Sequence, residues 1–272
     1  MVRRLFFALV AGLALAGSNA AGMAGPICTL VVDSKSGAVL TENGDCETRV
    51  TPASTFKIAL AAIGFEEGLL QGPQEPVRQY RKGEVDWGGR AWRGLVDPTS
   101  WMKHSVVWYS QRLTRQLGAD KLEAWTRALG YGNADFSGDP GKGNGLERAW
   151  IASSLAISPR EQARFLRGLL NRTLPLSQSA MAQTEALVER FSIDGGWTLS
   201  GKTGGAYPRR ADGSFDRARG YGWFVGWATR GDTRAVFVRL TQDEVRHSVS
   251  PGLRARSALL AEWPALAARF AR

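Results

Sequence analysis

An apolar segment that follows a Ser-x-x-Lys pattern most constrains what this chain can fold into. Residues 58–65 read Ile-Ala-Leu-Ala-Ala-Ile-Gly-Phe, and Ser54 and Lys57 come directly before them. A helix that is apolar on every side is buried in a protein core. We therefore expect other elements to surround this helix, with Ser54 and Lys57 at its start.

The spacing of Ser54 and Lys57 allows them to act together. At the start of a helix, residues i and i+3 share one face, with Cβ atoms about 5–6 Å apart. A hydroxyl and an amine held in this way can serve as nucleophile and base. Apolar surroundings favour the neutral, proton-accepting form of a lysine. The alternative is a serine that caps the helix and a lysine that reaches into water.

The N-terminus has the pattern of an export signal. A pair of arginines precedes an apolar run from Leu5 to Ala16, and the small residues of Ser18–Ala20 suit cleavage after position 20. The alternative, an uncleaved anchor, would need a longer apolar run. We expect residues 1–20 to be a signal peptide and the mature chain to be periplasmic, with no stable membrane insertion.

Export would place Cys28 and Cys46 in an oxidising compartment, where a disulfide is favoured over two unpaired thiols. Between them, residues 29–32 and 38–40 read as two strands around the turn residues 33–37. A bridge would fasten this hairpin close to the Ser54 helix.

The charge of the chain bears on its partners. The formal net charge is +10, and removal of Arg3 and Arg4 with the signal leaves +8. Such a charge can indicate nucleic acid or a membrane surface as partner. The arginines are scattered, with acidic residues between them, so we interpret them as a solvated basic surface and expect no nucleic-acid partner. We expect a small-molecule substrate and a monomer or homodimer.

Strand patterns at both ends enclose a helical middle. After loops at 71–98, the spacing predicts helices at 105–117, 120–129, 159–170 and 178–190, strands at 197–200, 221–228 and 235–240, and a last helix at 251–269. The predicted fold class is α+β, with one antiparallel sheet made by the N- and C-terminal parts, flanking helices and an all-helical second lobe. We expect a single domain over 21–272, with a sheet lobe at about 21–65 and 191–272 and a helical lobe at about 66–190.

Lys202-Thr-Gly204 follows the strand at 197–200 and offers a cation, a hydroxyl and a small residue to an anionic, extended ligand. The spelling Gly196-x-x-x-x-Gly201-Lys-Thr also meets the phosphate-binding loop pattern. That pattern needs a helix after the threonine, which Gly205 and Pro208 discourage. We therefore reject a nucleotide site here.

Other catalytic patterns are missing from the sequence. His104 and His247 are the only histidines, and neither stands in a metal-binding spacing, so no metal site is expected. The chain also has no Gly-x-Ser-x-Gly pattern, which argues against an α/β-hydrolase triad.

The remaining patterns are weak one by one, but their order is specific. Ser54-Thr-Phe-Lys57, Ser105-Val-Val107, Tyr131-Gly-Asn133, Lys202-Thr-Gly204 and Tyr221-Gly-Trp-Phe-Val-Gly-Trp227 follow one another along the chain. In this order they resemble the class D, oxacillinase-type serine β-lactamases of the β-lactamase and penicillin-binding protein superfamily. The resemblance covers nearly the whole mature chain, and it departs from class A, which has Ser-Asp-Asn at the second position.

The resemblance implies catalytic roles. Ser54 would attack the β-lactam carbonyl, and the backbone N–H groups of Ser54 and Gly205 would form the oxyanion hole. CO₂ would carboxylate Lys57 to N6-carboxylysine, which requires a neutral amine. This carbamate would be the general base of acylation and deacylation, and no cofactor besides CO₂ or bicarbonate is expected.

Four further residues would surround the modified lysine. Trp150 would donate a hydrogen bond to the carbamate, although the preceding glycine-rich loop looks longer than in the family and a plain core tryptophan is the alternative. Val107 and Ile151 would form an apolar cover. Ser105 would carry a proton to the lactam nitrogen.

The substrate carboxylate would be bound by Lys202, Thr203 and Arg254, with Arg256 as the alternative arginine. The resemblance also assigns to substrate binding Tyr131, Asn133 and Gly204.

The implied activity is hydrolysis of penicillin-type antibiotics through a serine acyl-enzyme, which would give antibiotic resistance. Two alternatives share the motifs: a penicillin-binding transpeptidase or carboxypeptidase, and a β-lactam sensor domain that acylates without turnover. Apolar Val107 and a tryptophan near the lysine favour hydrolysis. The preferred β-lactam depends on loop shapes around residues 87–102 and 206–220.

Overall fold

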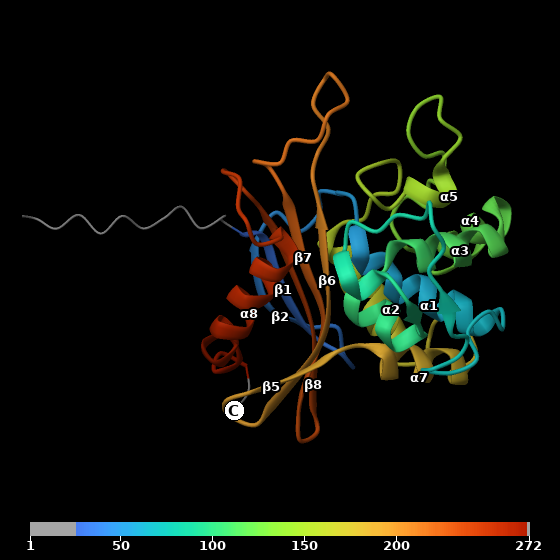
Figure 1. Cartoon of the computed structure of the whole chain (residues 1–272). Coiled ribbons are helices and arrows are strands. Elements are labelled where there is room, and N and C mark those ends of the chain that lie inside the picture. The colour runs from blue at the N-terminus through green and yellow to red at the C-terminus, as the bar shows by residue number, and fades with distance from the viewer. Residues whose placement is uncertain (1–25, 271–272) are drawn as a thin grey trace, which may run out of the picture.

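The computed structural model describes residues 26–270, and its central element is a six-stranded antiparallel sheet (Figure 1). The strands of this sheet are β1 (Pro26–Asp33), β2 (Val39–Gly44), β5 (Arg190–Ile193), β6 (Trp197–Ala206), β7 (Tyr221–Arg230) and β8 (Thr233–Gln242). Their order across the sheet is β2-β1-β8-β7-β6-β5, so strands from both ends of the chain lie side by side. A separate two-stranded sheet pairs β3 (Arg78–Gln79) with β4 (Leu95–Val96). The expected antiparallel sheet is confirmed.

Helices cover both faces of the large sheet (Figure 1). They are α1 (Phe56–Glu66), α2 (Pro98–His104), α3 (Val107–Leu117), α4 (Ala119–Ala128), α5 (Gly145–Arg148), α6 (Pro159–Leu170), α7 (Gln178–Leu187) and α8 (Pro251–Ala267), with short 3₁₀ turns η1 (Ala53–Thr55) and η2 (Gly89–Trp92). Helix α8 packs on β6, β7 and β8, while α6 contacts β1, β7 and β8 from the other side. Helix α1 lies among α3, α7 and η1.

The alternation of side chains along β7 explains the two layers of core. Trp223, Val225 and Trp227 belong to the core between the sheet and α1–α7, whereas Phe224 and Ala228 belong to the core under α8. Successive side chains on a strand point to opposite faces. A strand that is buried on both faces therefore reads as one apolar run, as β7 does.

Local sequence determines several element boundaries. Ser158 and Glu161 form a capping box at the start of α6, and the side chain of Asp97 accepts from the Ser100 amide at the start of α2. A disulfide joins Cys28 to Cys46 and connects β1 to the segment after β2.

Several expectations about elements are wrong. The helix expected over 178–190 ends at Leu187, and strand β5 begins at Arg190. Helix α2 follows the predicted loops and was not expected, and Ser105 ends this helix rather than starting the next one, which begins at Val107. Asp120 lies inside α4 and does not cap it. Lys202 lies within β6, which continues to Ala206, because neighbouring β7 pairs with it over its whole length.

The predicted signal peptide lies outside the described residues. Between residues 26 and 270, no helix combines the length and the apolar character needed to cross a membrane.

Candidate active site

Ser54 is the one accessible point in a buried segment. Every other residue from Thr51 to Phe65 is buried, whereas Ser54 is partly exposed. The preceding Ala53 has a φ of 50°, a left-handed conformation that a residue with a Cβ rarely adopts. Such strain is typical of functional sites. The turn η1 thus presents the Ser54 hydroxyl to solvent at the start of α1.

Lys57 lies one turn further along and is 1% exposed. Its amine has no hydrogen-bond partner among the described residues. Burial lowers the pKa of this amine well below its usual value, and the nearby charge of Lys202 lowers it further. Burial therefore favours the neutral form of this amine, and a neutral amine is what a base or a CO₂ acceptor requires.

Lys202 is also buried, at 4% exposure, but its amine is hydrogen-bonded. It donates to the hydroxyl of Ser105 over 2.5 Å and to the Thr203 carbonyl over 3.1 Å. Burial lowers the pKa of Lys202 to about 7; Glu189 opposes this shift and Arg256 adds to it. Near neutral pH this amine can hold or release a proton, unlike that of Lys57.

Ser105 lies between α2 and α3 in a left-handed conformation, with a φ of 55°. This strained turn directs its hydroxyl toward Lys202, which is distant in sequence. Val107 begins α3 and is buried. The order Ser-x-Val thus places the polar side chain of Ser105 beside Lys202 and the apolar side chain of Val107 in the core.

The glycines after Lys202 bring β6 against the turn η1. A Cβ on Gly204 would lie 2.8 Å from the Pro52 carbonyl oxygen and 3.1 Å from Thr55. Any side chain here would separate β6 from η1. Gly205 is exposed and Thr203 is half-buried, so this end of β6 is accessible to solvent.

Trp150 and Ile151 follow α5. The indole of Trp150 is buried and its centroid lies 5.6 Å from that of the Phe56 ring, the neighbour of Lys57 in the chain. Ile151 is half-buried against the same core. Ala152 has a φ of 53°, which is a further strained residue next to a motif position.

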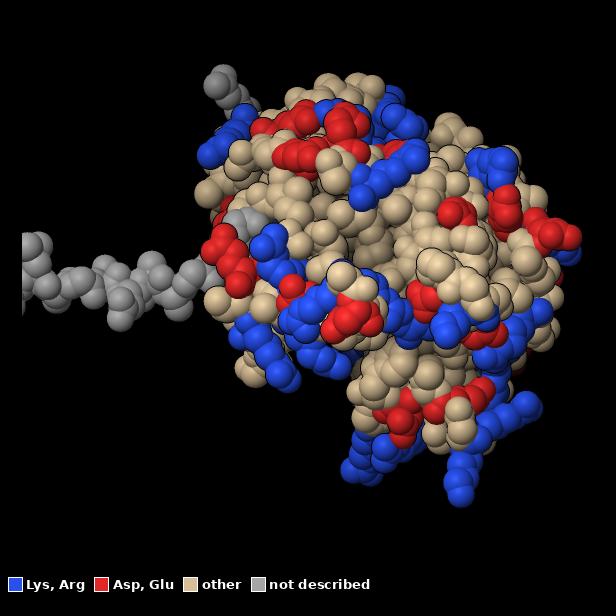
Figure 2. Space-filling view, turned by 90° about the horizontal axis from the view of Figure 1, so that it is seen from above, with Lys and Arg blue, Asp and Glu red and all other residues tan. Residues whose placement is uncertain are grey.

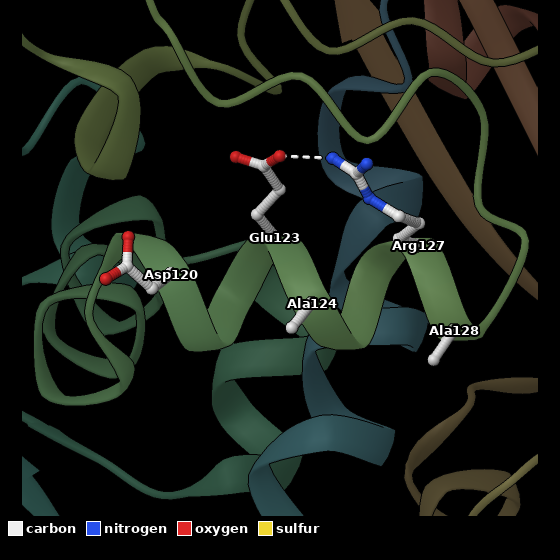
Figure 3. Close-up of a pocket in the computed structure, with 5 residues that line it drawn as sticks. All are labelled: Asp120, Glu123, Ala124, Arg127 and Ala128. Carbon is white, nitrogen blue, oxygen red and sulfur yellow. Dashed lines mark hydrogen bonds and ion pairs between the residues drawn. The ribbon is translucent and has the colours of Figure 1, made fainter.

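The pocket that Figure 3 shows lies elsewhere. It is formed by one side of α4, and its lining residues are Asp120, Glu123, Ala124, Arg127 and Ala128. Glu123 and Arg127 form an ion pair one turn apart on this helix. None of the motif residues takes part in it.

A search among known proteins agrees with the geometry. The model of the penicillin binding protein transpeptidase domain matches residues 27–259. The chain is 39% identical to β-lactamase OXA-9 of Klebsiella pneumoniae, over 88% of this chain and 87% of the relative. It is 33% identical to β-lactamase OXA-1 of Escherichia coli, over 84% and 80% respectively. The crystal structure of the class D β-lactamase OXA-427 superposes with a TM-score of 0.81 at 42% identity, covering 88% of this chain and 97% of that one.

The chain belongs to the class D β-lactamases.

Tyr131 and Asn133 make internal hydrogen bonds in this class D β-lactamase. Tyr131 is completely buried, its hydroxyl accepts from the Gln162 amide, and burial raises its pKa. Asn133 is exposed, and its side chain donates to the Ser154 carbonyl and accepts from the Ala156 amide, which joins two loops. The expected role of both residues in substrate binding stays a prediction.

Both candidate arginines of this β-lactamase already have acidic partners. Arg254 pairs with Asp243 and donates to the Val249 carbonyl. Arg256 lies 3.7 Å from Glu189 and stacks over the Phe191 ring. Only Arg256 contributes to the shifted pKa of Lys202, so it is the arginine whose charge reaches the Lys202 amine.

Charged side chains are mixed over the surface of the β-lactamase. On the face in Figure 2, acidic side chains lie among the lysines and arginines around a central hollow. The excess positive charge is therefore spread over the face and does not form one uniform patch.

Sequence reasoning missed Thr51 and Gln162. The Thr51 hydroxyl contacts Trp150 and Ala152, and the Gln162 amide donates to Thr55 and Tyr131. Neither residue belongs to a sequence motif that predicts a catalytic or binding role. Their partners are distant in sequence, so no local pattern could have indicated them.

Proposed function

We propose that this class D β-lactamase hydrolyses the β-lactam ring of penicillin-type antibiotics through an acyl-enzyme on Ser54. The observation that carries the proposal is the Lys57 amine, which is buried and unpartnered one turn from the only accessible residue of its segment. A neutral amine one helical turn from a hydroxyl is a pairing of groups that nucleophilic catalysis can use.

In the acylation half, the Ser54 oxygen attacks the lactam carbonyl while its proton passes to the base at Lys57. The C–N bond of the ring breaks, and the ring nitrogen takes a proton through Ser105, which is hydrogen-bonded to Lys202. The backbone N–H groups of Ser54 and Gly205 stabilise the oxyanion. In the second half, a water attacks the ester and the Ser54 hydroxyl is restored.

We further propose that Lys57 is N-carboxylated. The buried, unpartnered and neutral amine fits this modification, because CO₂ reacts only with an unprotonated amine. The added carboxylate would supply the general base of both halves. Trp150, Val107 and Ile151 would hold it and exclude water.

The substrate carboxylate would lie against Lys202 and Thr203. Lys202 is charged below about pH 7 and is near the exposed backbone of Gly205. Arg256, or Arg254 after a change of partner, would supply a second cation.

Antibiotic resistance and a periplasmic location, after removal of a signal peptide at residues 1–20, belong to the same proposal. A small β-lactam is the partner we propose, and the enzyme would act as a monomer or homodimer.

Turnover of nitrocefin separates this function from its alternatives. A hydrolase converts many equivalents per enzyme, whereas a transpeptidase or a sensor domain stops near one equivalent. The chain also matches the model of a transpeptidase domain, so the number of turnovers per enzyme has to be measured. The Ser54→Ala variant should form no covalent penicilloyl adduct by mass spectrometry, and an adduct on that variant would assign the nucleophile elsewhere.

The carboxylated base has its own test. Enzyme purified at low pH should gain activity when bicarbonate is added, and removal of CO₂ should reverse the gain. Turnover that does not depend on CO₂ would contradict carboxylation while leaving the Ser54 acyl-enzyme intact.

A further inference from the structure

Thr51 is a buried hydroxyl that connects the nucleophile turn to the segment carrying Trp150. It lies three residues before Ser54 and is 9% exposed. Its hydroxyl donates to the Trp150 carbonyl over 3.0 Å and accepts from the Ala152 amide over 3.0 Å. One side chain thus uses both its donor and its acceptor on two peptide groups that flank Ile151.

Thr51 is itself held in place by the sheet. Its carbonyl accepts a hydrogen bond of 2.9 Å from the indole N–H of Trp223 in β7. Pro52 follows directly, and its carbonyl accepts from the Thr55 hydroxyl over 2.7 Å. The position of the Thr51 hydroxyl is therefore determined by β7 and by the turn that presents Ser54.

The segment that Thr51 holds is strained. Ala152 has a φ of 53°, a conformation that is unfavourable for a residue with a Cβ and persists only when its surroundings enforce it. The Ile151 amide donates to the Arg148 carbonyl over 2.7 Å, which fixes the other side of this turn. Without the Thr51 hydroxyl, two partly buried peptide groups would lose their partner and Ala152 could relax.

We propose that Thr51 is a positioning residue that holds the backbone of Trp150 and Ile151, the residues proposed above to enclose the carboxylated Lys57. It acts through the backbone of residues 150–152. The Trp150 ring packs on Phe56, the residue before Lys57, so a shift of this backbone would move the proposed cover of the modified lysine. This inference rests on the proposed carboxylation of Lys57, which needs dry surroundings and a neutral amine.

The experiment compares the bicarbonate requirement of variants after CO₂ has been removed at low pH. Thr51→Val removes the hydroxyl at nearly constant volume, Thr51→Ser keeps it, and Thr126→Val is the matched control. Thr126 is fully buried, and its hydroxyl donates to a carbonyl inside α4. We expect Thr51→Val to need about tenfold more bicarbonate for half-maximal nitrocefin turnover, since a lost buried hydrogen bond has this order of effect. Thr51→Ser and Thr126→Val should match the wild type.

The outcomes separate the two proposals. A Thr51→Val enzyme with the bicarbonate requirement of the wild type overturns the role of Thr51 alone, as does a Thr51→Ser enzyme with the requirement of Thr51→Val. A wild type that does not respond to bicarbonate removes the carboxylated base, and the role of Thr51 with it. If Thr51→Val does not fold, Thr51→Ala takes its place. A thermal melt of each variant separates a loss of global stability from a change at Lys57.

Discussion

Lys57 at the start of α1 and Lys202 in β6 are both almost fully buried, yet they differ in their hydrogen-bond partners. The Lys57 amine has none among residues 26–270, whereas Lys202 donates to Ser105 and to a backbone carbonyl. Burial lowers the pKa of both amines, that of Lys57 well below its usual value and that of Lys202 to about 7. Neighbouring charges add to the difference between the two lysines, because Glu189 opposes the shift at Lys202 and no acid does so at Lys57 among the causes of its shift.

This difference suggests that the two lysines have separate roles. A neutral amine is suited to accept a proton or CO₂, and a partly charged amine is suited to bind an anion and to exchange a proton with Ser105. One lysine also affects the other, because the charge of Lys202 lowers the pKa of Lys57. The variants below test whether the two roles are separate.

Replacement of Lys57 should have the largest effect. Lys57→Ala removes the base, and we expect kcat/KM for nitrocefin to fall about 10³-fold, which is within the usual range for general-base catalysis. Bicarbonate should not restore activity. The matched control is Lys121→Ala, which removes an exposed lysine on α4. Lys57→Ala activity above about a tenth of the wild type would show that the neutral amine is not the base.

Replacement of Lys202 should act mainly on binding. We expect Lys202→Ala to lower kcat/KM for an anionic penicillin about 10- to 100-fold, as for a lost charged hydrogen bond, with most of the change in KM. Lys202→Arg should recover part of this loss because it keeps the positive charge. The proposed separation of the roles of Lys57 and Lys202 would be contradicted if kcat of Lys202→Ala drops as far as that of Lys57→Ala while KM is unchanged.

Gly204→Ala tests whether the contact between β6 and η1 is needed. The new Cβ would meet the Pro52 carbonyl oxygen at 2.8 Å. We expect the free energy of unfolding to fall by about 1–3 kcal/mol, as for overpacked cores, and activity to fall with it. Gly72→Ala is the control, since a Cβ there would meet nothing within 4 Å. Equal denaturant midpoints for the two variants would contradict the close contact.

The pH dependence should show the smallest effect. The pKa of Lys202 is lowered from 10.5 to about 7, so its amine loses its charge as the pH rises through about 7. For an anionic substrate we expect kcat/KM to fall up to about tenfold between about pH 6 and 8 from this titration. Lys202→Arg should lack this component, because a guanidinium stays protonated. An identical pH profile for the two enzymes would assign the titration to another group.

The same shift affects stability. Between about pH 7 and 10.5, the unfolded chain keeps the Lys202 proton and the folded chain does not. The contribution of Lys202 to the free energy of unfolding therefore increases with pH over this window and is least favourable below about pH 7.

Some features of the fold follow directly from local patterns. The apolar run after Lys57 predicts a buried helix, the capping box at Ser158 predicts the start of α6, and the short apolar run of β7 predicts a strand. Helix α2 was missed although Asp97 and Pro98 are a local start signal, because it is short and follows a segment rich in Gly and Pro. The extension of β6 through Lys202 comes from pairing with β7, which a short window of sequence does not contain.

The candidate site likewise has features that the sequence predicts and features that only the tertiary structure shows. The sequence by itself determined that Ser54 and Lys57 share one helical turn in apolar surroundings, because that distance is set by the geometry of one helix. Only the tertiary structure decided which lysine has no partner, that Tyr131 is internal, that each arginine faces an acid, and that Thr51 reaches Trp150. Desolvation and hydrogen bonding depend on groups that lie a hundred residues apart in the chain, and these groups meet only once the sheet and the helices have packed.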